Sequence, residues 1–214
     1  MFFPKKIIFW PMLLLLYPAY ADPVPYPFYF GLIAGYGSTT WKGLVPKDSN
    51  QSLALNMSTP IEVDEGGSVI GVMSGFEISS NAAIEVKYTR FQDAIVTFDH
   101  LSLFSFSHDN ALQFVTKTET IQVIGKLLVA FPDERFRVFS GAGIAEVHRK
   151  DELINNWRLS PSFDLGLNYR FSERFMAEIA GNYTAGYGES QLNPAEAYYP
   201  FLFSVALHLL YCFG

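Results

Sequence analysis

Alternation of apolar with polar or small residues across residues 157–171 is the feature that most restricts how this chain can fold. One parity is apolar throughout: Trp157, Leu159, Pro161, Phe163, Leu165, Leu167, Tyr169 and Phe171. The other parity is Arg158, Ser160, Ser162, Asp164, Gly166, Asn168 and Arg170. Successive side chains of a β-strand point to opposite faces, so this period of two predicts a strand with one apolar and one polar face. Residues 201–213 repeat the alternation with a less polar second face.

The same period predicts further strands along the chain. We expect them at residues 28–40, 68–79, 82–91, 116–131, 135–147 and 174–187. Tight links at residues 79–81, 132–134 and 172–173 alternate with long polar links at residues 42–67, 92–115, 148–156 and 188–200. Short turns at one end and longer loops at the other are typical of membrane barrels. The sequence therefore predicts an all-β fold, a closed antiparallel up-and-down transmembrane β-barrel of about eight strands.

The first residues predict a secretory signal peptide. Two lysines precede an apolar segment at residues 7–16, and an Ala-Tyr-Ala cleavage site follows at residues 19–21. We expect residues 1–21 to be removed and residues 22–214 to form the barrel domain. No later run of about 18 apolar residues predicts a membrane-spanning helix. Cys212 is the only cysteine, so no disulfide can form within one chain.

Alternation alone does not say whether the apolar face points into a soluble, lipocalin-like barrel or out into lipid. Aromatic residues favour lipid, because they gather at both ends of the expected strands. Those near the turns are Phe28, Phe30, Phe76, Phe131, Phe136, Phe171, Phe175, Tyr211 and Phe213. Those near the loops are Tyr36, Tyr88, Trp157, Tyr183, Tyr187 and Phe201. Two such girdles mark two membrane interfaces, so we expect the bacterial outer membrane, with the long loops extracellular.

Charged residues occupy the polar face that would line the barrel interior. They are Glu77, Glu85, Lys87, Lys126, Arg137, Asp164, Arg170 and Glu178. A barrel of about eight strands is just filled by its own side chains, and charges of mixed sign can neutralise one another there. We therefore expect these residues to form a charge network that plugs the lumen. A gated proton or ion path along the same residues is the alternative.

The chain resembles the family of small outer-membrane β-barrels that includes OmpA, OmpX and the opacity-type surface proteins. The resemblance rests on the turn block at residues 169–178, which aligns without gaps on residues 76–85, and on the last strand. The alternating residues of that strand are Phe203, Val205, Leu207, Leu209, Tyr211 and Phe213. The resemblance implies that they form the insertion signal read by the barrel-assembly machinery. The chain departs from the pattern in ending with Gly214 after the aromatic residue.

Candidate catalytic and metal-binding residues are few. Residues 106–111 are similar to the His-x-Ser-Asn-Ala motif of lipid A deacylases, but no serine stands two residues after His108. His100 and His108 share one loop with three aspartates, without a recognised ligand spacing. The sequence therefore predicts no enzyme, no cofactor and no metal. A net charge of -6 argues against a nucleic-acid partner.

The expected function is that of a non-enzymatic surface or structural barrel that serves adhesion or envelope integrity through its extracellular loops. Leu53, Leu55 and Met57 are the candidate contacts in the first loop, although they could instead extend a hairpin above the membrane. The expected partners are outer-membrane lipid and lipopolysaccharide, the barrel-assembly machinery and host surface molecules. The alternatives are a narrow porin-like channel, a lipid A-modifying enzyme and a soluble lipocalin-like carrier.

Overall fold

The computed structural model describes residues 24–41, 60–102, 105, 109–132, 135–187 and 198–214. The expected signal peptide at residues 1–21 lies outside the described residues, and so do Leu53, Leu55, Met57 and His108. Within the described ranges, no helix is both long enough and apolar enough to cross a membrane.

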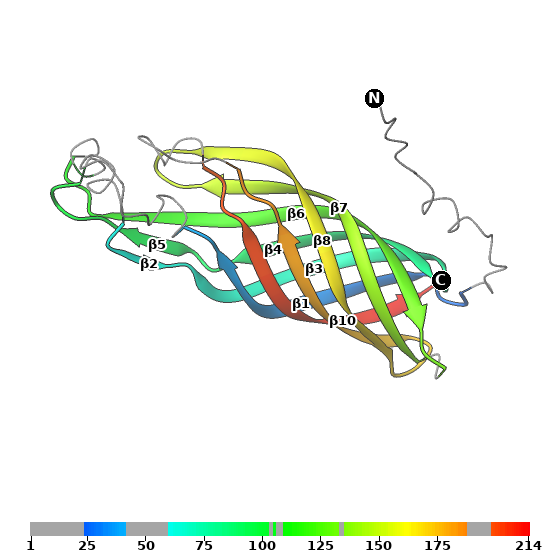
Figure 1. Cartoon of the computed structure of the whole chain (residues 1–214). Helices are drawn as coiled ribbons and strands as arrows, with labels where there is room; N and C mark the ends of the chain where they lie inside the picture. The colour runs from blue at the N-terminus through cyan, green and yellow to red at the C-terminus, as the bar shows by residue number, and fades with distance from the viewer. Residues whose placement is uncertain (1–23, 42–59, 103–104, 106–108, 133–134, 188–197) are drawn as a thin grey trace, which may run out of the picture.

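Eight antiparallel strands close into a barrel (Figure 1). They are β1 (Phe28–Thr39), β3 (Gly66–Ser79), β4 (Ala82–Phe91), β6 (Gln113–Ala130), β7 (Phe136–Lys150), β8 (Asn155–Arg170), β9 (Phe175–Thr184) and β10 (Leu202–Phe213). Each strand pairs with the next of this series, and β10 pairs with β1 to complete the ring. Closure pairs the backbone groups of every barrel strand on both sides, as a hydrocarbon environment requires. The predicted closed eight-stranded barrel is confirmed.

Strand boundaries match the expected ones closely at the turn end and less well at the loop end. The expected strand at residues 82–91 is β4 itself. Strand β6 begins at Gln113 rather than residue 116, and β7 continues to Lys150 rather than residue 147. The prediction of a loop at residues 148–156 was therefore wrong for most of that segment. The two strands continue because each gives the other a ladder partner, as in the pair Lys117 and Lys150.

Two short strands, β2 (Glu62–Asp64) and β5 (Ala94–Thr97), lie in segments expected to be loops. They pair with each other, and β5 also pairs with the beginning of β6. Arg90 is opposite Glu119 and Ala94 is opposite Thr116, so the chain between β4 and β5 contains one residue more than its partner. Such a bulge bends a strand and increases its twist. We call β2, β5 and the first residues of β6 the extension, which lies at one end of the barrel (Figure 1).

The outer wall is an apolar belt. Outward positions of β6 from Ile121 to the turn are apolar, and those of β10 from Phe203 to Phe213 are exposed apolar residues throughout. On the side of the tight turns, no outward position is charged beyond Ile121 in β6, Ile144 in β7 or Leu159 in β8. Aromatic rings meet at both borders, as in the pairs Phe28–Phe76 at 4.8 Å and Phe175–Tyr211 at 5.3 Å near the turns and Tyr183–Phe203 at 5.0 Å near the loops.

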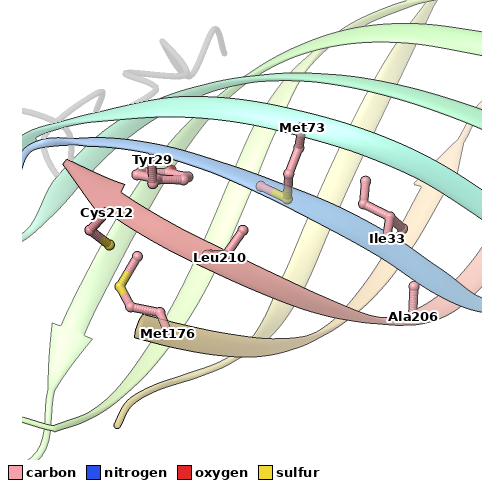
Figure 2. Packing of buried hydrophobic residues seen from close by; sticks show 7 residues of the cluster. All are labelled: Tyr29, Ile33, Met73, Met176, Ala206, Leu210 and Cys212. Carbon is pink, nitrogen blue, oxygen red and sulfur yellow. The ribbon is translucent and has the colours of Figure 1, made fainter. Parts of the chain in front are cut away.

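One side of the lumen is apolar. Figure 2 shows the side chains of this cluster, which come from β1, β3, β9 and β10: Tyr29, Ile33, Met73, Met176, Ala206, Leu210 and Cys212. Gly75 makes the position of Tyr29 possible, because a Cβ on Gly75 would lie 2.2 Å from the Tyr29 ring. Cys212 is a buried free thiol in this cluster. The charged residues share the rest of the interior with smaller apolar clusters, such as that of Leu128 and Phe139, and with neutral polar residues.

Candidate functional site

All eight charged residues expected in the lumen lie on the inner face of the barrel. Seven are almost completely buried, with at most 5% of each residue exposed: Glu77, Glu85, Lys87, Lys126, Arg137, Asp164 and Glu178. The eighth, Arg170, has a side chain that is 19% exposed. These residues come from six strands: β3, β4, β6, β7, β8 and β9. The barrel thus brings together residues up to 93 positions apart in the sequence.

Near the turns, Glu77 joins two arginines. Its Oε1 accepts a hydrogen bond of 2.6 Å from Arg137 Nη2, and its Oε2 accepts one of 2.9 Å from Arg170 Nη2. Arg137 also donates to Asn168 Oδ1 at 3.0 Å, and Asn168 Nδ2 donates to Glu178 at 2.9 Å. Asn168 therefore connects this lower cluster to the charges above it.

In the middle of the barrel, Lys126 joins two carboxylates. Its Nζ lies 2.6 Å from Glu85 Oε1 and 2.8 Å from Glu178 Oε2, and the side chain is 1% exposed. The same ammonium lies 3.8 Å from the centre of the Phe139 ring. Burial strengthens the attraction between the Lys126 ammonium and the Phe139 ring, because no water competes for the cation.

Lys87 connects the middle cluster to the opposite wall. Its Nζ donates a hydrogen bond to Asp164, across 77 positions of sequence. It also lies 3.1 Å from Glu85 Oε2 without the alignment of a hydrogen bond, so that contact is electrostatic. Asp164 accepts a further bond from Asn182. Each of these buried charges is thereby paired, as burial requires.

The two signs balance in this network. Four cations (Lys87, Lys126, Arg137 and Arg170) face four anions (Glu77, Glu85, Asp164 and Glu178). Such a set costs desolvation energy but leaves no uncompensated charge inside the barrel. Side chains that meet across the lumen also occupy the path that an ion would follow.

Four polar residues that bond to the network were not among the predicted site residues, and one of them is Asn182, which donates to Asp164. Tyr29 donates to Glu85 at 2.7 Å, Asn168 makes the contacts described above, and His208 Nδ1 lies 3.2 Å from Glu178 Oε2. The sequence did contain a signal for Tyr29, Asn168 and His208, because each stands at an inward-facing position of its strand, between apolar residues that face outward. His208 is 3% exposed and shares its carboxylate with Lys126.

The residues of the expected insertion signal line the outer face of β10. Phe203, Val205, Leu207, Leu209, Tyr211 and Phe213 are between 42% and 62% exposed. Phe213 lies 6.1 Å from Phe28, ring centre to ring centre, at the closure of the barrel. Tyr211 lies against Phe175 in the lower girdle. Recognition of this strand by the assembly machinery stays a prediction.

The extension has a hydrophobic core of its own. Its buried members are Trp41, Ala94, Val96, Phe98, Phe114 and Tyr198, with Val63 and Leu153 packed against them. Trp41 is fully buried, and its ring lies 5.8 Å from that of Phe114 and 5.4 Å from that of Tyr198. Burial raises the pKa of the Tyr198 phenol, which stays protonated and donates to the Thr40 carbonyl.

Arg149 fastens this core to β7. Its guanidinium lies 4.8 Å from the Trp41 ring, its Nε donates to Asp151 Oδ2 at 2.6 Å, and its Nη1 donates to the Tyr198 carbonyl. The residue is fully buried. Sequence reasoning placed Arg149 in a loop, although it continues the inward parity of Val147. The extension is therefore a packed structure and not only a pair of loops.

The segment between β5 and β6 shows no catalytic arrangement in its described residues. Ser105 Oγ donates toward the Asp99 and Ala111 carbonyls, and Ser102 Oγ donates to Ser105 Oγ. These serines are thus engaged in holding the loop. His100 lies 3.1 Å from the neighbouring Asp99 and is exposed. Over the described ranges, no group of three or more His, Cys, Asp or Glu residues is placed to hold a metal ion.

Comparison with known proteins gives a likeness of structure. No family model matches the sequence, and no curated protein matches it either. The Neisserial surface protein A is 12% identical, with a TM-score of 0.55 over 87% of this chain and 97% of that one. The outer membrane protein OprG of Pseudomonas aeruginosa is 11% identical, with a TM-score of 0.50 over 86% of this chain and 96% of that one. At such identities the likeness concerns the fold.

Proposed function

We propose that this chain, which has the fold of the small outer-membrane β-barrel proteins, is a non-enzymatic protein of the bacterial outer membrane that contacts an external partner through its extension. In this proposal the barrel anchors the chain in lipid and lipopolysaccharide after insertion by the barrel-assembly machinery. The extension lies outside the cell, where host surface molecules are the candidate partner. The Neisserial protein is, by its name, also a surface protein.

The outer wall supports the membrane location. A belt without charges, bordered by aromatic rings at two heights, fits a hydrocarbon layer between two interfaces. A soluble carrier would place this apolar face inside and the charges outside. Here Glu85, Lys87 and Lys126 are buried inside while Leu165 and Val205 are more than 60% exposed.

The lumen supports an anchoring role over transport. In an eight-stranded barrel the side chains just fill the interior, and here they do so with paired charges. A wide aqueous channel would leave these groups in contact with water. The balanced network therefore argues against a porin-like function.

The extension carries the functional proposal. Five large apolar residues are exposed on or beside it: Ile61 (66%), Ile95 (38%), Leu101 (55%), Leu112 (45%) and Val115 (44%). Ile95 and Val115 are direct cross-strand neighbours on the outer face. They lie beyond the lipid-facing belt, so lipid does not explain their exposure. An exposed apolar cluster on a rigid core is typical of a protein contact surface.

Replacing Ile95, Leu112 and Val115 together by serine is expected to abolish most attachment of the expressing bacteria to host cells or matrix. Their exposed position means that the barrel should assemble normally. The measurement is a count of attached cells, with the shift between heated and unheated samples on a detergent gel as the check of barrel assembly.

Tyr187→Ser is the matched control, because Tyr187 is 37% exposed at the same end of the barrel but outside the extension. A second arm replaces Leu53, Leu55 and Met57 by serine, to test the contact residues proposed from the sequence. Unchanged attachment in both triple variants, with intact barrels, would reject adhesion and leave a role in envelope integrity. Recovery of the wild-type protein in the soluble periplasmic fraction would reject the membrane location itself.

A further inference from the structure

Two lysines face each other on the outer surface of the barrel. Lys117 of β6 and Lys150 of β7 are direct cross-strand partners, and both are exposed. Neither forms a salt bridge with any residue that the structure describes. Like charges directly opposite each other on one face of a sheet destabilise the pair. The arrangement becomes favourable when an anion lies between the two ammonium groups.

Two of the nearby carboxylates, those of Glu119 and Asp93, already lie close to a basic side chain. The next outward row toward the membrane contains Glu119, His148 and Trp157, in which Glu119 Oε2 lies 3.6 Å from His148 Nδ1. His148 stacks on Trp157 with ring centres 4.3 Å apart. Asp93 lies 3.6 Å from Arg90. Glu146 is one row further down, four residues from Lys150 along β7.

The height of the lysines corresponds to the head groups of a lipid leaflet. The outward face of β6 becomes apolar at Ile121, four residues from Lys117. Four residues span about 13 Å along a strand, which is about 10 Å along the membrane normal at the usual strand tilt. Trp157 lies between these levels, as aromatic residues do at an interface. A flexible lysine side chain can also extend from its strand toward the level of the lipid head groups.

The wall beneath the lysines has room for an acyl chain. Gly125 faces outward on β6 opposite Ala142 of β7, and a Cβ on Gly125 would meet only the Ala142 carbonyl oxygen, at 3.8 Å. Val123 and Ile144 form the outward cross-strand pair just above. The apolar wall of β6 and β7 therefore leaves open space at Gly125, eight residues along β6 from Lys117 on the side of the turns.

We propose that Lys117 and Lys150 together bind the phosphate of an anionic lipid of the outer leaflet, with an acyl chain of that lipid lying along the β6–β7 wall over Gly125. Phosphate fits the site because its charge can meet two ammonium groups at once, each with three donors. The inference rests on the proposed membrane location, since only a bilayer supplies phosphate and acyl chain at these two heights.

The test is equilibrium binding of fluorescent, doubly phosphorylated lipid A to the purified barrel in detergent. We expect Lys117→Gln and Lys150→Gln each to weaken binding about fivefold, and the double variant about 25-fold, from the usual contribution of a cation near an anionic lipid surface. Arg158→Gln is the matched control. Arg158 is an exposed cation at the same end, but it lies over the Tyr187 ring on the inner side of the rim.

Three results would overturn the proposal. The first is equal affinity of the double variant and the wild-type protein. The second is equal binding of dephosphorylated lipid A, which would remove the role of the phosphate. The third is displacement by inorganic phosphate alone at comparable concentration, which would indicate a site for soluble anions. Fractionation and attachment assays test the proposed function separately, because lipid binding in detergent requires neither export nor a host partner.

Discussion

Replacing Lys126 by methionine is expected to lower the free energy of unfolding of the barrel by about 3–5 kcal/mol. Lys126 is the cation between Glu85 and Glu178, and its side chain is 1% exposed. Methionine keeps most of the length of the side chain and removes the charge, so three cations of the network remain against four anions. The cost arises because the remaining carboxylates stay buried without full compensation. Urea unfolding of the protein folded into lipid vesicles measures it.

Two further variants distinguish the effect of losing the charge network from any general effect of replacing a lysine by methionine. Lys117→Met makes the same change at an exposed position, where removing one of two facing lysines should leave the unfolding midpoint unchanged or raise it slightly. Combining Lys126→Met with Glu178→Gln restores equal numbers of cations and anions, and should recover part of the loss as a coupling energy between the two sites. A Lys126→Met barrel as stable as the Lys117→Met barrel would mean that the network does not stabilise the fold.

The same variant tests whether the lumen is sealed. Without the Lys126 ammonium, Glu85 and Glu178 lose the cation that holds them together across the lumen, so any conductance of the variant in planar bilayers should exceed that of the wild-type protein. Large, stable currents from the wild-type protein would contradict the closed interior and favour the channel alternative.

The barrel itself could be predicted from the sequence because two simple constraints act together. A period of two assigns each residue to a face, and a membrane permits strands only in a closed ring. The parity in β8 thus placed Asp164 and Arg170 inside and Leu165 outside, as the structure has them. The composition of the lumen followed from parity alone.

The pairing of the charges could not be predicted in the same way. Lys87 meets Asp164 across the barrel, and Arg137 meets Glu77 at a separation of 60 residues. Which cation reaches which anion depends on strand tilt and on the stagger of each strand against the next, and alternation carries no information about either. Sequence reasoning could identify the members of the network but not their contacts.

The extension was missed because its signals are short and interrupted. Strand β2 has three residues and β5 has four, too few for alternation to be distinguished from chance. The bulge after Arg90 also shifts the register by one residue, so the parity of β4 does not continue into β5. Trp41 and Tyr198 come together in its core from segments 157 residues apart, which no local pattern shows.

Replacing Trp41 by alanine is expected to destabilise the extension by about 3–5 kcal/mol while the barrel stays assembled. The Trp41 ring is fully buried against Phe114 and Tyr198, and the Arg149 guanidinium lies over it. Its loss leaves a cavity and removes one of the two aromatic rings that contact the buried Arg149 guanidinium. Barrel closure does not depend on this contact, because the ring of eight strands closes through backbone pairing below it.

Hydrogen exchange at the amides of β2 and β5 measures the effect, and we expect exchange to accelerate at least about a hundredfold there, with little change in β8 and β9. Trp157→Ala is the matched control, because Trp157 is 38% exposed on the outer wall and stacks only on His148 among its ring contacts in the described structure. If the extension presents the partner surface, Trp41→Ala should also reduce attachment without altering Ile95 or Val115. Loss of attachment with unchanged exchange would instead place the partner contact close to Trp41 itself, whereas faster exchange with full attachment would remove the extension from the binding site.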